Sequence, residues 1–232
     1  MSDNVIALKG MRGMIADNMR RSLDEAAQLT HHASCDVTDL LAYKALLSDE
    51  GINVSVEDLL CDCVVGVLKK HPEMNGRVEG QEIVLSSAIH LSVAIALPGN
   101  LLVAPTIFDA QTLSLQEKRE ARKALITKAR KGKLSIAEMT KGTFTVSNLG
   151  LSRVQYFTPI INIPQIAILG IGQTVKRNEI NEQGDVETRS ILGLSLTFDH
   201  RAVDGGPAAE FLTSLCEHIE QGSGCLSHQT YH

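Results

Sequence analysis

Apolar positions in the first part of the chain repeat at helical spacing. Ile15, Met19 and Leu23 are four residues apart and form one apolar stripe, which predicts a helix over residues 11–27. Residues 29–37 read as a strand. An amphipathic helix therefore leads directly into an extended segment.

Two more helices are predicted close behind this strand. Thr38 is a suitable cap for a helix over residues 39–48, and Gly51 lies just past its end. Ser55 with Asp58 gives a second start signal. The apolar residues that follow keep helical spacing as far as His71-Pro72, and we interpret them as core positions.

Residues 90–97 and 101–107 predict two strands joined by a tight turn at Pro98-Gly99-Asn100. Capping signals follow. The pair Ser114 and Glu117 predicts a basic helix to about Lys131, and Ser135 with Glu138 predicts a shorter one.

Polar and apolar residues alternate from Thr143 onwards, as they do in a strand with two different faces. The alternation places Phe144 and Val146 on the core face and Thr143, Thr145 and Ser147 on the other. Ser147 is therefore expected at a strand end, pointing away from the core.

The last third of the chain predicts two further strands, over residues 165–171 and 186–198, and then a helix. The buried stripe of that helix is Phe211, Leu212, Leu215, Cys216 and Ile219. This mixed order predicts an α/β (α+β) sandwich with a mixed central sheet flanked by helices, rather than regular βαβ units.

Composition narrows the class of protein. The chain has 232 residues, 44% of them hydrophobic, enough for one full core, and a net charge of −5. That charge and the 3% aromatic content argue against nucleic-acid binding. We expect no membrane span and no signal peptide, since no apolar run approaches 20 residues and the start lacks charged and apolar regions. An intracellular protein is expected, cytoplasmic or, in a eukaryote, in the mitochondrial matrix.

The five cysteines include no C-x-x-C pair, which favours reduced packing residues over disulfides or a zinc site. We find no linker or repeat within residues 5–220. The expected organisation is an N-terminal arm (1–8), one catalytic domain (9–221) and a flexible C-terminal tail (222–232).

The segment that carries the most chemistry is LSLTFDHRAVDGGPAAE, residues 194–210. An alternating strand ends in an Asp-His-Arg turn, and Pro207 suits the first turn of the next helix. His200 is thus expected in a constrained loop. A histidine near its reference pKa of about 6.5 is mostly unprotonated at neutral pH and can accept a proton from a thiol. From spacing alone, a surface salt bridge with Asp204 or a partly buried histidine is the more common explanation of this pair, and a metal site is a weaker alternative.

A second segment, GTFTVSNLG at residues 142–150, ends its strand at Ser147. A hydroxyl there can donate a hydrogen bond to the oxyanion of a tetrahedral intermediate, but alone it is more often an ordinary strand-end serine.

Together these segments resemble the catalytic core of the dihydrolipoamide acyltransferases, the E2 components of 2-oxoacid dehydrogenase complexes, which are related in fold to chloramphenicol acetyltransferase. The resemblance covers roughly residues 8–220 and is carried, in order, by Gly10-Met11-Arg12, Ser92-Val93-Ala94, Pro98-Gly99-Asn100-Leu101, GTFTVSNLG, FTPIINIPQIAILGIG and DHRAVDG. Several spaced motifs make it far more specific than His-x-x-x-Asp-Gly alone.

The resemblance implies an activity and named roles. His200 would deprotonate the thiol of coenzyme A or dihydrolipoamide, Ser147 would stabilise the oxyanion, and Asp204 would brace the catalytic loop. No metal would be needed. The family forms homotrimers with the cleft between subunits, so His200 of one chain would meet Ser147 of a neighbour. Arg12 would hold the Asp204 loop by an ion pair.

The same resemblance implies partners. A lipoyl domain would bring the acyl group, and the E1 and E3 components would act through it. This chain carries neither a lipoyl nor a subunit-binding domain, and its end lacks the family's apolar segment, so trimers are expected rather than a large shell. Acetyl, succinyl and branched-chain acyl groups all stay open. Two rival functions are an inactive scaffold and a coenzyme A-dependent enzyme with a non-lipoyl acceptor.

Three other features are assigned structural roles. His31, His32, Cys35 and Asp36 alternate in direction along a strand, which disfavours joint metal binding. Gly170-Ile171-Gly172 lacks the third glycine of a dinucleotide motif. We expect solvent exposure for the basic residues that follow Ser114, namely Lys118, Arg119, Arg122, Lys123, Lys128, Arg130, Lys131 and Lys133.

Overall fold

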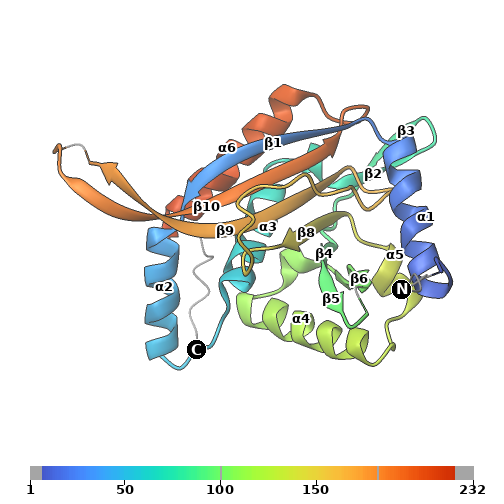
Figure 1. The fold of residues 1–232 in the computed structure, drawn as a ribbon, viewed down its shortest axis with the longest axis horizontal. Helices are drawn as coiled ribbons and strands as arrows, with labels where there is room; N and C mark the ends of the chain where they lie inside the picture. Colours follow the sequence, from blue (N-terminus) through green and yellow to red (C-terminus); the bar gives the residue numbers. More distant parts are fainter. Residues whose placement is uncertain (1–6, 100, 182, 223–232) are drawn as a thin grey trace, which may run out of the picture.

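A mixed six-stranded sheet with helices packed on it forms the centre of the protein in the computed structural model, which describes residues 7–99, 101–181 and 183–222 (Figure 1). The predicted arm and tail fall largely outside these residues. The helices are α1 (Gly10–Glu25), α2 (Thr38–Asp49), α3 (Val56–Leu68), α4 (Leu115–Arg130), α5 (Ile136–Thr140) and α6 (Gly205–Glu220), with 3₁₀ turns η1 (Pro72–Met74) and η2 (Ala110–Thr112). The predicted sandwich fold is confirmed.

The six strands of the main sheet lie in the order β1-β10-β9-β8-β4-β7. They are β1 (Gln28–Asp36), β4 (Leu91–Val93), β7 (Thr106–Ile107), β8 (Phe144–Asn148), β9 (Ala167–Ile180) and β10 (Val186–Asp199). Strand β8 runs parallel to both β4 and β9, and the other pairs are antiparallel. Two small sheets, β2 (Gly76–Glu79) with β3 (Glu82–Leu85) and β5 (Ile95–Leu97) with β6 (Leu101–Val103), complete the described strands.

Helix α6 buries its apolar stripe against the sheet, and α3, which is buried on nearly all sides, packs against α6 and α4. Phe211 and Leu215 of α6 are fully buried, and the ring of Phe211 lies 5.8 Å from that of Phe144 on β8. Cys216, predicted in the same stripe, is only half buried. No helix of the described ranges is both long and apolar enough to cross a bilayer.

An irregular segment, residues 149–166, covers part of β9 and β10. Its Gln155 carbonyl lies so close to the sheet that a Cβ at Gly172 or Gly193 would come within 1.9 or 2.0 Å of it. Val154 accepts a hydrogen bond of 2.7 Å from the amide of Gln173. Glycine at these two strand positions is what allows the backbones to approach.

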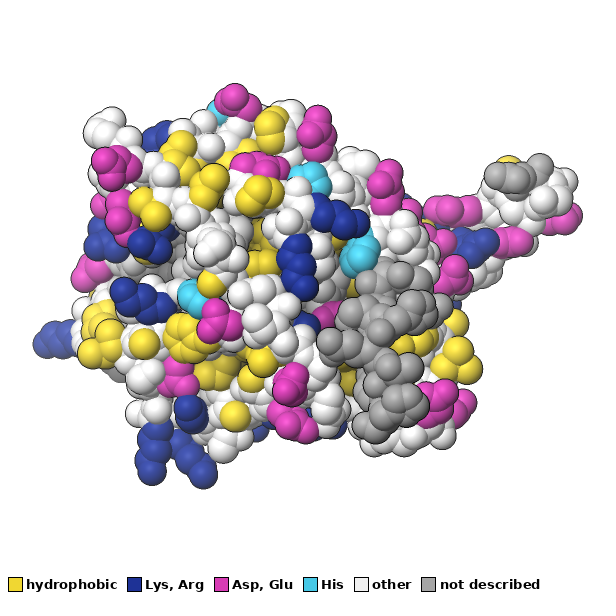
Figure 2. Space-filling view, turned by 180° about the vertical axis from the view of Figure 1, so that it is seen from behind, with side chains coloured by type: hydrophobic (Ala, Val, Ile, Leu, Met, Phe, Trp, Pro, Cys, Tyr) yellow, Lys and Arg dark blue, Asp and Glu magenta, His cyan; other side chains and the backbone are white. Residues whose placement is uncertain are grey.

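Strand β9 is longer than the sequence predicted, whereas β10 matches its predicted range to within one residue. The two strands extend beyond the body as a two-stranded ribbon (Figure 1). Figure 2 shows acidic and basic side chains interspersed along it. Ile180 and Val186, paired near its tip, are exposed.

The capping signals predicted for three helices are confirmed as complete capping boxes at the starts of α3, α4 and α5. The prediction for Thr38 was wrong, because α2 begins at that residue. Its hydroxyl donates to the Asp36 carboxylate (2.5 Å) and accepts from the amide of Ser190 (2.9 Å), tying β1 to β10.

The strands predicted on either side of Pro98-Gly99-Asn100 exist, but each is divided. Residues nearest the turn pair as β5 and β6, whereas those farther away pair as β4 and β7 within the main sheet. The hairpin of β2 and β3 was not predicted. Gly80, at its turn, has φ of +60°, a conformation that favours glycine.

Two cations of α4 depart from the expected solvent exposure, since Lys118 is buried and Arg122 is partly buried. Lys118 donates to the Asp62 carboxylate of α3 at 2.7 Å and to the carbonyl of Leu113. Arg122 binds Glu57 and Asp58 at the start of α3. These ion pairs fasten α4 to α3.

Replacing Lys118 with methionine is expected to lower the free energy of unfolding by about 3 kcal/mol, because the Asp62 carboxylate stays buried without its cation. The measurement is urea unfolding followed by circular dichroism. Lys123→Met, at an exposed position of the same helix, should change the free energy by no more than about 0.5 kcal/mol. Equal effects of the two substitutions would show that the buried pair contributes no more to the free energy of unfolding than an exposed lysine does.

Candidate active site

His200 follows directly on the last residue of β10, at the end of the strand. Its backbone amide donates a hydrogen bond of 2.8 Å to the carbonyl of Ala27, just before β1. Its ring lies against that of Phe198, with 5.9 Å between centroids, and the side chain is 45% exposed. The backbone of the histidine is thus fixed while the imidazole stays accessible to a second molecule.

The turn that carries His200 is braced by Asp199, whose carboxylate is buried. That carboxylate accepts hydrogen bonds from the amides of Ala27 (3.2 Å) and Arg201 (3.0 Å) and pairs with the Arg201 guanidinium, the shortest contact being 2.6 Å. Its carbonyl accepts from the amides of Ala202 and Val203. Asp199 therefore joins β1, β10 and the turn.

The ion pair also sets the charge state of both groups. Burial acts to raise the pKa of the Asp199 carboxyl, but the hydrogen bonds from Arg201 outweigh it and hold the pKa below its ordinary value. The hydrogen bond from Arg201 to Asp199 raises the pKa of the guanidinium. Asp199 is a carboxylate throughout the neutral range.

The family resemblance implies that Asp204 braces the catalytic loop, and that role stays a prediction, whereas the contacts of Asp199 were not predicted. Asp204 precedes α6, makes no side-chain cap there, and is largely exposed, with its Oδ1 3.6 Å from Nδ1 of His200. The sequence did contain a signal for this contact, because a charged residue on the buried side of a strand requires a partner of opposite charge. The nearest cation in the sequence is Arg201.

Ser147 is the fourth residue of β8 and lies opposite Gly170 of β9. The prediction that its face points away from the core was wrong for the strand as a whole, because Thr143 and Thr145 are buried too. The hydroxyl of Thr145 donates to Gln165 at 2.5 Å, and that of Thr143 donates to Asn75 at 2.6 Å. Ser147, at the strand end, is only half buried.

His200 and Ser147 of one chain lie far apart. Ser147 is level with Gly170 of β9, which pairs with Ser195 of β10, five residues before His200. Five residues span about 17 Å and two strand spacings about 10 Å, so the separation is roughly 20 Å. One tetrahedral carbon cannot contact both side chains of a single chain.

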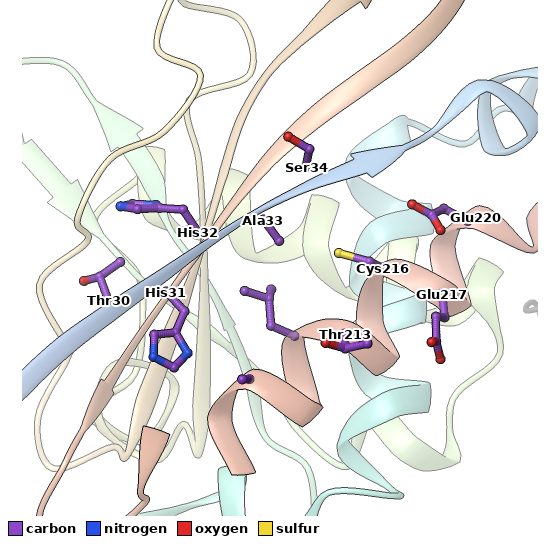
Figure 3. Close-up of a pocket in the computed structure, with 11 residues that line it drawn as sticks. Thr30, His31, His32, Ala33, Ser34, Thr213, Cys216, Glu217 and Glu220 are labelled. Atoms are coloured by element: carbon purple, nitrogen blue, oxygen red, sulfur yellow. The ribbon is translucent and has the colours of Figure 1, made fainter. Parts of the chain in front are cut away.

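The hollow that lies between β1 and α6 involves neither residue. Residues 30–34 line one side and α6 residues that include Cys216, Glu217 and Glu220 line the other (Figure 3). His31 and His32 leave β1 in opposite directions, as predicted, and Nδ1 of His32 lies 2.9 Å from the hydroxyl of Ser195. Within the described ranges, no group of three His, Cys, Asp or Glu residues is arranged to hold a metal.

The ion pair expected between Arg12 and the Asp204 loop is not formed within one chain. Arg12 lies in the first turn of α1 and donates a hydrogen bond of 3.1 Å to the carbonyl of Gly99. The His200 turn adjoins Ala27, beyond the other end of α1. At 1.5 Å per residue the two ends of this helix are more than about 20 Å apart.

Several known proteins are similar to this chain. It is 36% identical over 97% of its length to the probable dihydrolipoyllysine-residue succinyltransferase component of the 2-oxoglutarate dehydrogenase complex of Schizosaccharomyces pombe, covering 51% of that protein. It is 37% identical over 95% of its length to the dihydrolipoyllysine-residue acetyltransferase component of the acetoin cleaving system of Bacillus subtilis, covering 56%. The chain spans about half the length of these relatives.

Solved structures of related proteins are similar to this chain as well. The dihydrolipoamide acetyltransferase of Azotobacter vinelandii has a TM-score of 0.88 at 28% identity, covering 97% of this chain and 94% of that one. Chloramphenicol acetyltransferase shares the fold, with a TM-score of 0.56 at 14% identity, covering 94% of this chain and 98% of the other. The family profile of the 2-oxoacid dehydrogenases acyltransferase (catalytic domain) matches residues 1–226. The chain therefore belongs to the 2-oxoacid dehydrogenase acyltransferase catalytic-domain family.

Proposed function

We propose that this chain transfers an acyl group between dihydrolipoamide and coenzyme A, with His200 as the general base. The observation that carries the proposal is the presentation of His200. Its backbone is fixed at a strand end next to an ion pair whose carboxylate, Asp199, is buried, while its ring stays open to solvent. Family membership supplies the class of reaction.

The chemistry follows from an unprotonated imidazole next to a thiol. His200 removes the thiol proton, and the thiolate attacks the thioester carbonyl carbon to form a tetrahedral intermediate. The intermediate collapses by breaking its bond to the other sulfur, and the departing thiolate takes the proton back from the imidazolium. Because both the attacking and the leaving groups are thiols, one base serves both directions.

Charge on the oxyanion has to be stabilised, and Ser147 is the proposed donor. Since His200 and Ser147 are roughly 20 Å apart in one chain, the hydroxyl must come from a second copy. A homotrimer with three such interfaces has closed symmetry and places every serine opposite a histidine. The study of the A. vinelandii enzyme concerns a serine, a histidine and an asparagine, the last two four positions apart, as His200 and Asp204 are.

The partners proposed are those of an E2 core. A lipoyl domain presents the dihydrolipoamide arm, and the E1 and E3 components act on that arm rather than on this chain. The names of the relatives support this placement, since they are components of a 2-oxoglutarate dehydrogenase complex and of an acetoin cleaving system.

The first test is an assay with free dihydrolipoamide and acetyl-, succinyl- or isobutyryl-coenzyme A. His200→Ala is expected to lower kcat by about 10³-fold, since the thiol loses its base, and Ser147→Ala by about 10²-fold. Ser135→Ala, the same change at the cap of α5, should leave kcat unchanged. No turnover by the wild type with any acyl group would favour a scaffold, and turnover only with a hydroxyl or amine acceptor would favour another acyltransferase.

The second test asks whether the two residues act from different chains. Subunits of His200→Ala and Ser147→Ala, co-expressed so that they form mixed trimers, should regain about one quarter of wild-type activity. Random pairing leaves one site in four with both side chains intact. The same proteins mixed after assembly are the control and should stay inactive. A lack of recovery in the co-expressed sample, with mixed trimers present, would contradict the shared site.

The third test concerns the ion pair between Asp199 and Arg201. Asp199→Asn is expected to lower the free energy of unfolding by about 2 kcal/mol at pH 7, because Arg201 loses its anionic partner. The pKa of Asp199 is lowered in the folded protein. Its stabilising contribution is therefore full above the unfolded pKa of about 3.9 and is lost as the pH falls through the folded value. The gap between wild type and variant should stay constant from pH 7 to about 5 and shrink below about 4. Urea unfolding over this range measures it, and a gap independent of pH would contradict the assignment.

A further inference from the structure

Strand β8 loses support on one side at the position of Ser147. Strand β4 pairs with Phe144, Thr145 and Val146 of β8, and its last partner in the register is Val93. From Ser147 onwards the register continues only on the β9 side, where Ser147 and Asn148 pair with Gly170 and Ile171. Sheet pairing therefore holds this strand end from one side only.

Asn148, the next residue, supplies the missing contact. Its side-chain nitrogen donates a hydrogen bond of 3.1 Å to Oε1 of Glu57, in the first turn of α3. Its side-chain oxygen accepts one of 2.8 Å from the amide of Gly150. The same amide group thus joins the strand end to a helix and closes the turn that follows.

Glu57 is itself held in place. Its other carboxylate oxygen, Oε2, accepts from Nη1 of Arg122 at 2.5 Å. The guanidinium also donates to Asp58 (2.7 Å) and to the hydroxyl of Ser55 (3.1 Å). The side chains of Arg122 and Asp58 are 12% and 2% exposed, so the group is shielded from water.

Burial acts to raise the pKa of Asp58, but hydrogen bonds from Arg122 and Ser55 lower it below its ordinary value. The Asp58 carboxylate that pairs with Arg122 therefore stays charged at neutral pH, and the Arg122 side chain of α4 holds the Glu57 acceptor of α3 in place. The Glu57 carboxylate is therefore held firmly enough to orient the Asn148 side chain that binds it.

We propose that Asn148, anchored by Glu57 and Arg122, is a positioning residue that aims the hydroxyl of Ser147 at the developing oxyanion. The inference rests on the proposed role of Ser147 and extends it. A donor stabilises an oxyanion only when it points at the place where the charge forms, and a displacement of about 1 Å costs much of the effect. Asn148 touches neither substrate in this role and acts through its neighbour.

The kinetic test uses graded variants of the contact. Asn148→Ala and Glu57→Ala each remove the hydrogen bond and should lower kcat by about tenfold or more, with KM for both thiol substrates changed by less than about twofold. Glu57→Gln keeps an oxygen that accepts from Asn148 and should stay within about threefold of wild type. Asn53→Ala, the same change at an exposed position before α3, is the matched control.

The decisive measurement is a double-variant cycle. If Asn148 acts through Ser147, adding Asn148→Ala to Ser147→Ala should cause no further loss of kcat. An equal tenfold loss in both backgrounds would assign Asn148 a general structural role and overturn the inference, as would an unchanged kcat or a change in KM alone. If one alanine variant fails to fold, judged by circular dichroism, the Glu57→Ala and Glu57→Gln pair decides in the same way.

The two proposals can fail separately. A loss of kcat in Ser147→Ala with none in Asn148→Ala would overturn only the positioning role. An unchanged kcat in Ser147→Ala would overturn the role of the serine and, with it, this inference.

Discussion

One buried carboxylate supports the part of the structure on which the proposed chemistry depends. Asp199 is almost fully buried, yet it is charged, and its hydrogen bonds run to the segment before β1, to the turn after β10 and to Arg201. Such a group is stable only when every partner is in place, because an unpaired buried charge is very costly. The position of His200 is thus set by a contact that tolerates little displacement.

A second constraint comes from the sheet. With β9 between β8 and β10, the two strand ends that carry Ser147 and His200 are displaced from each other both across and along the sheet. No local rearrangement closes roughly 20 Å without breaking the register. If both side chains act on one intermediate, assembly is a requirement of the reaction and not only a way of gathering copies.

The sequence predicted features that depend on neighbouring residues and missed those decided by tertiary structure. The capping boxes at Ser55, Ser114 and Ser135 were predicted correctly because both partners lie within three residues. The cation of Lys118 was assigned to solvent because its partner, Asp62, lies 56 residues away. His200 could be singled out from its turn, but its distance from Ser147 depends on the order of strands, which no local pattern contains.

His200 and Ser147 are held in place by the same kind of interaction, an ion pair between a carboxylate and a guanidinium. His200 follows a strand whose end is tied by the Asp199–Arg201 pair, and Ser147 precedes a residue tied to the Glu57–Arg122 pair. Arg201 binds Asp199 by several hydrogen bonds, whereas Arg122 binds Glu57 by one and is itself held by Asp58 and Ser55. In each case the guanidinium limits the rotation of the carboxylate. Each half of the site is therefore made rigid within its own part of the chain, before any partner binds. In the proposed shared site, two preformed halves would need only to be brought into register by the contact between copies, and the geometry for stabilising the transition state would not have to be built when substrate arrives.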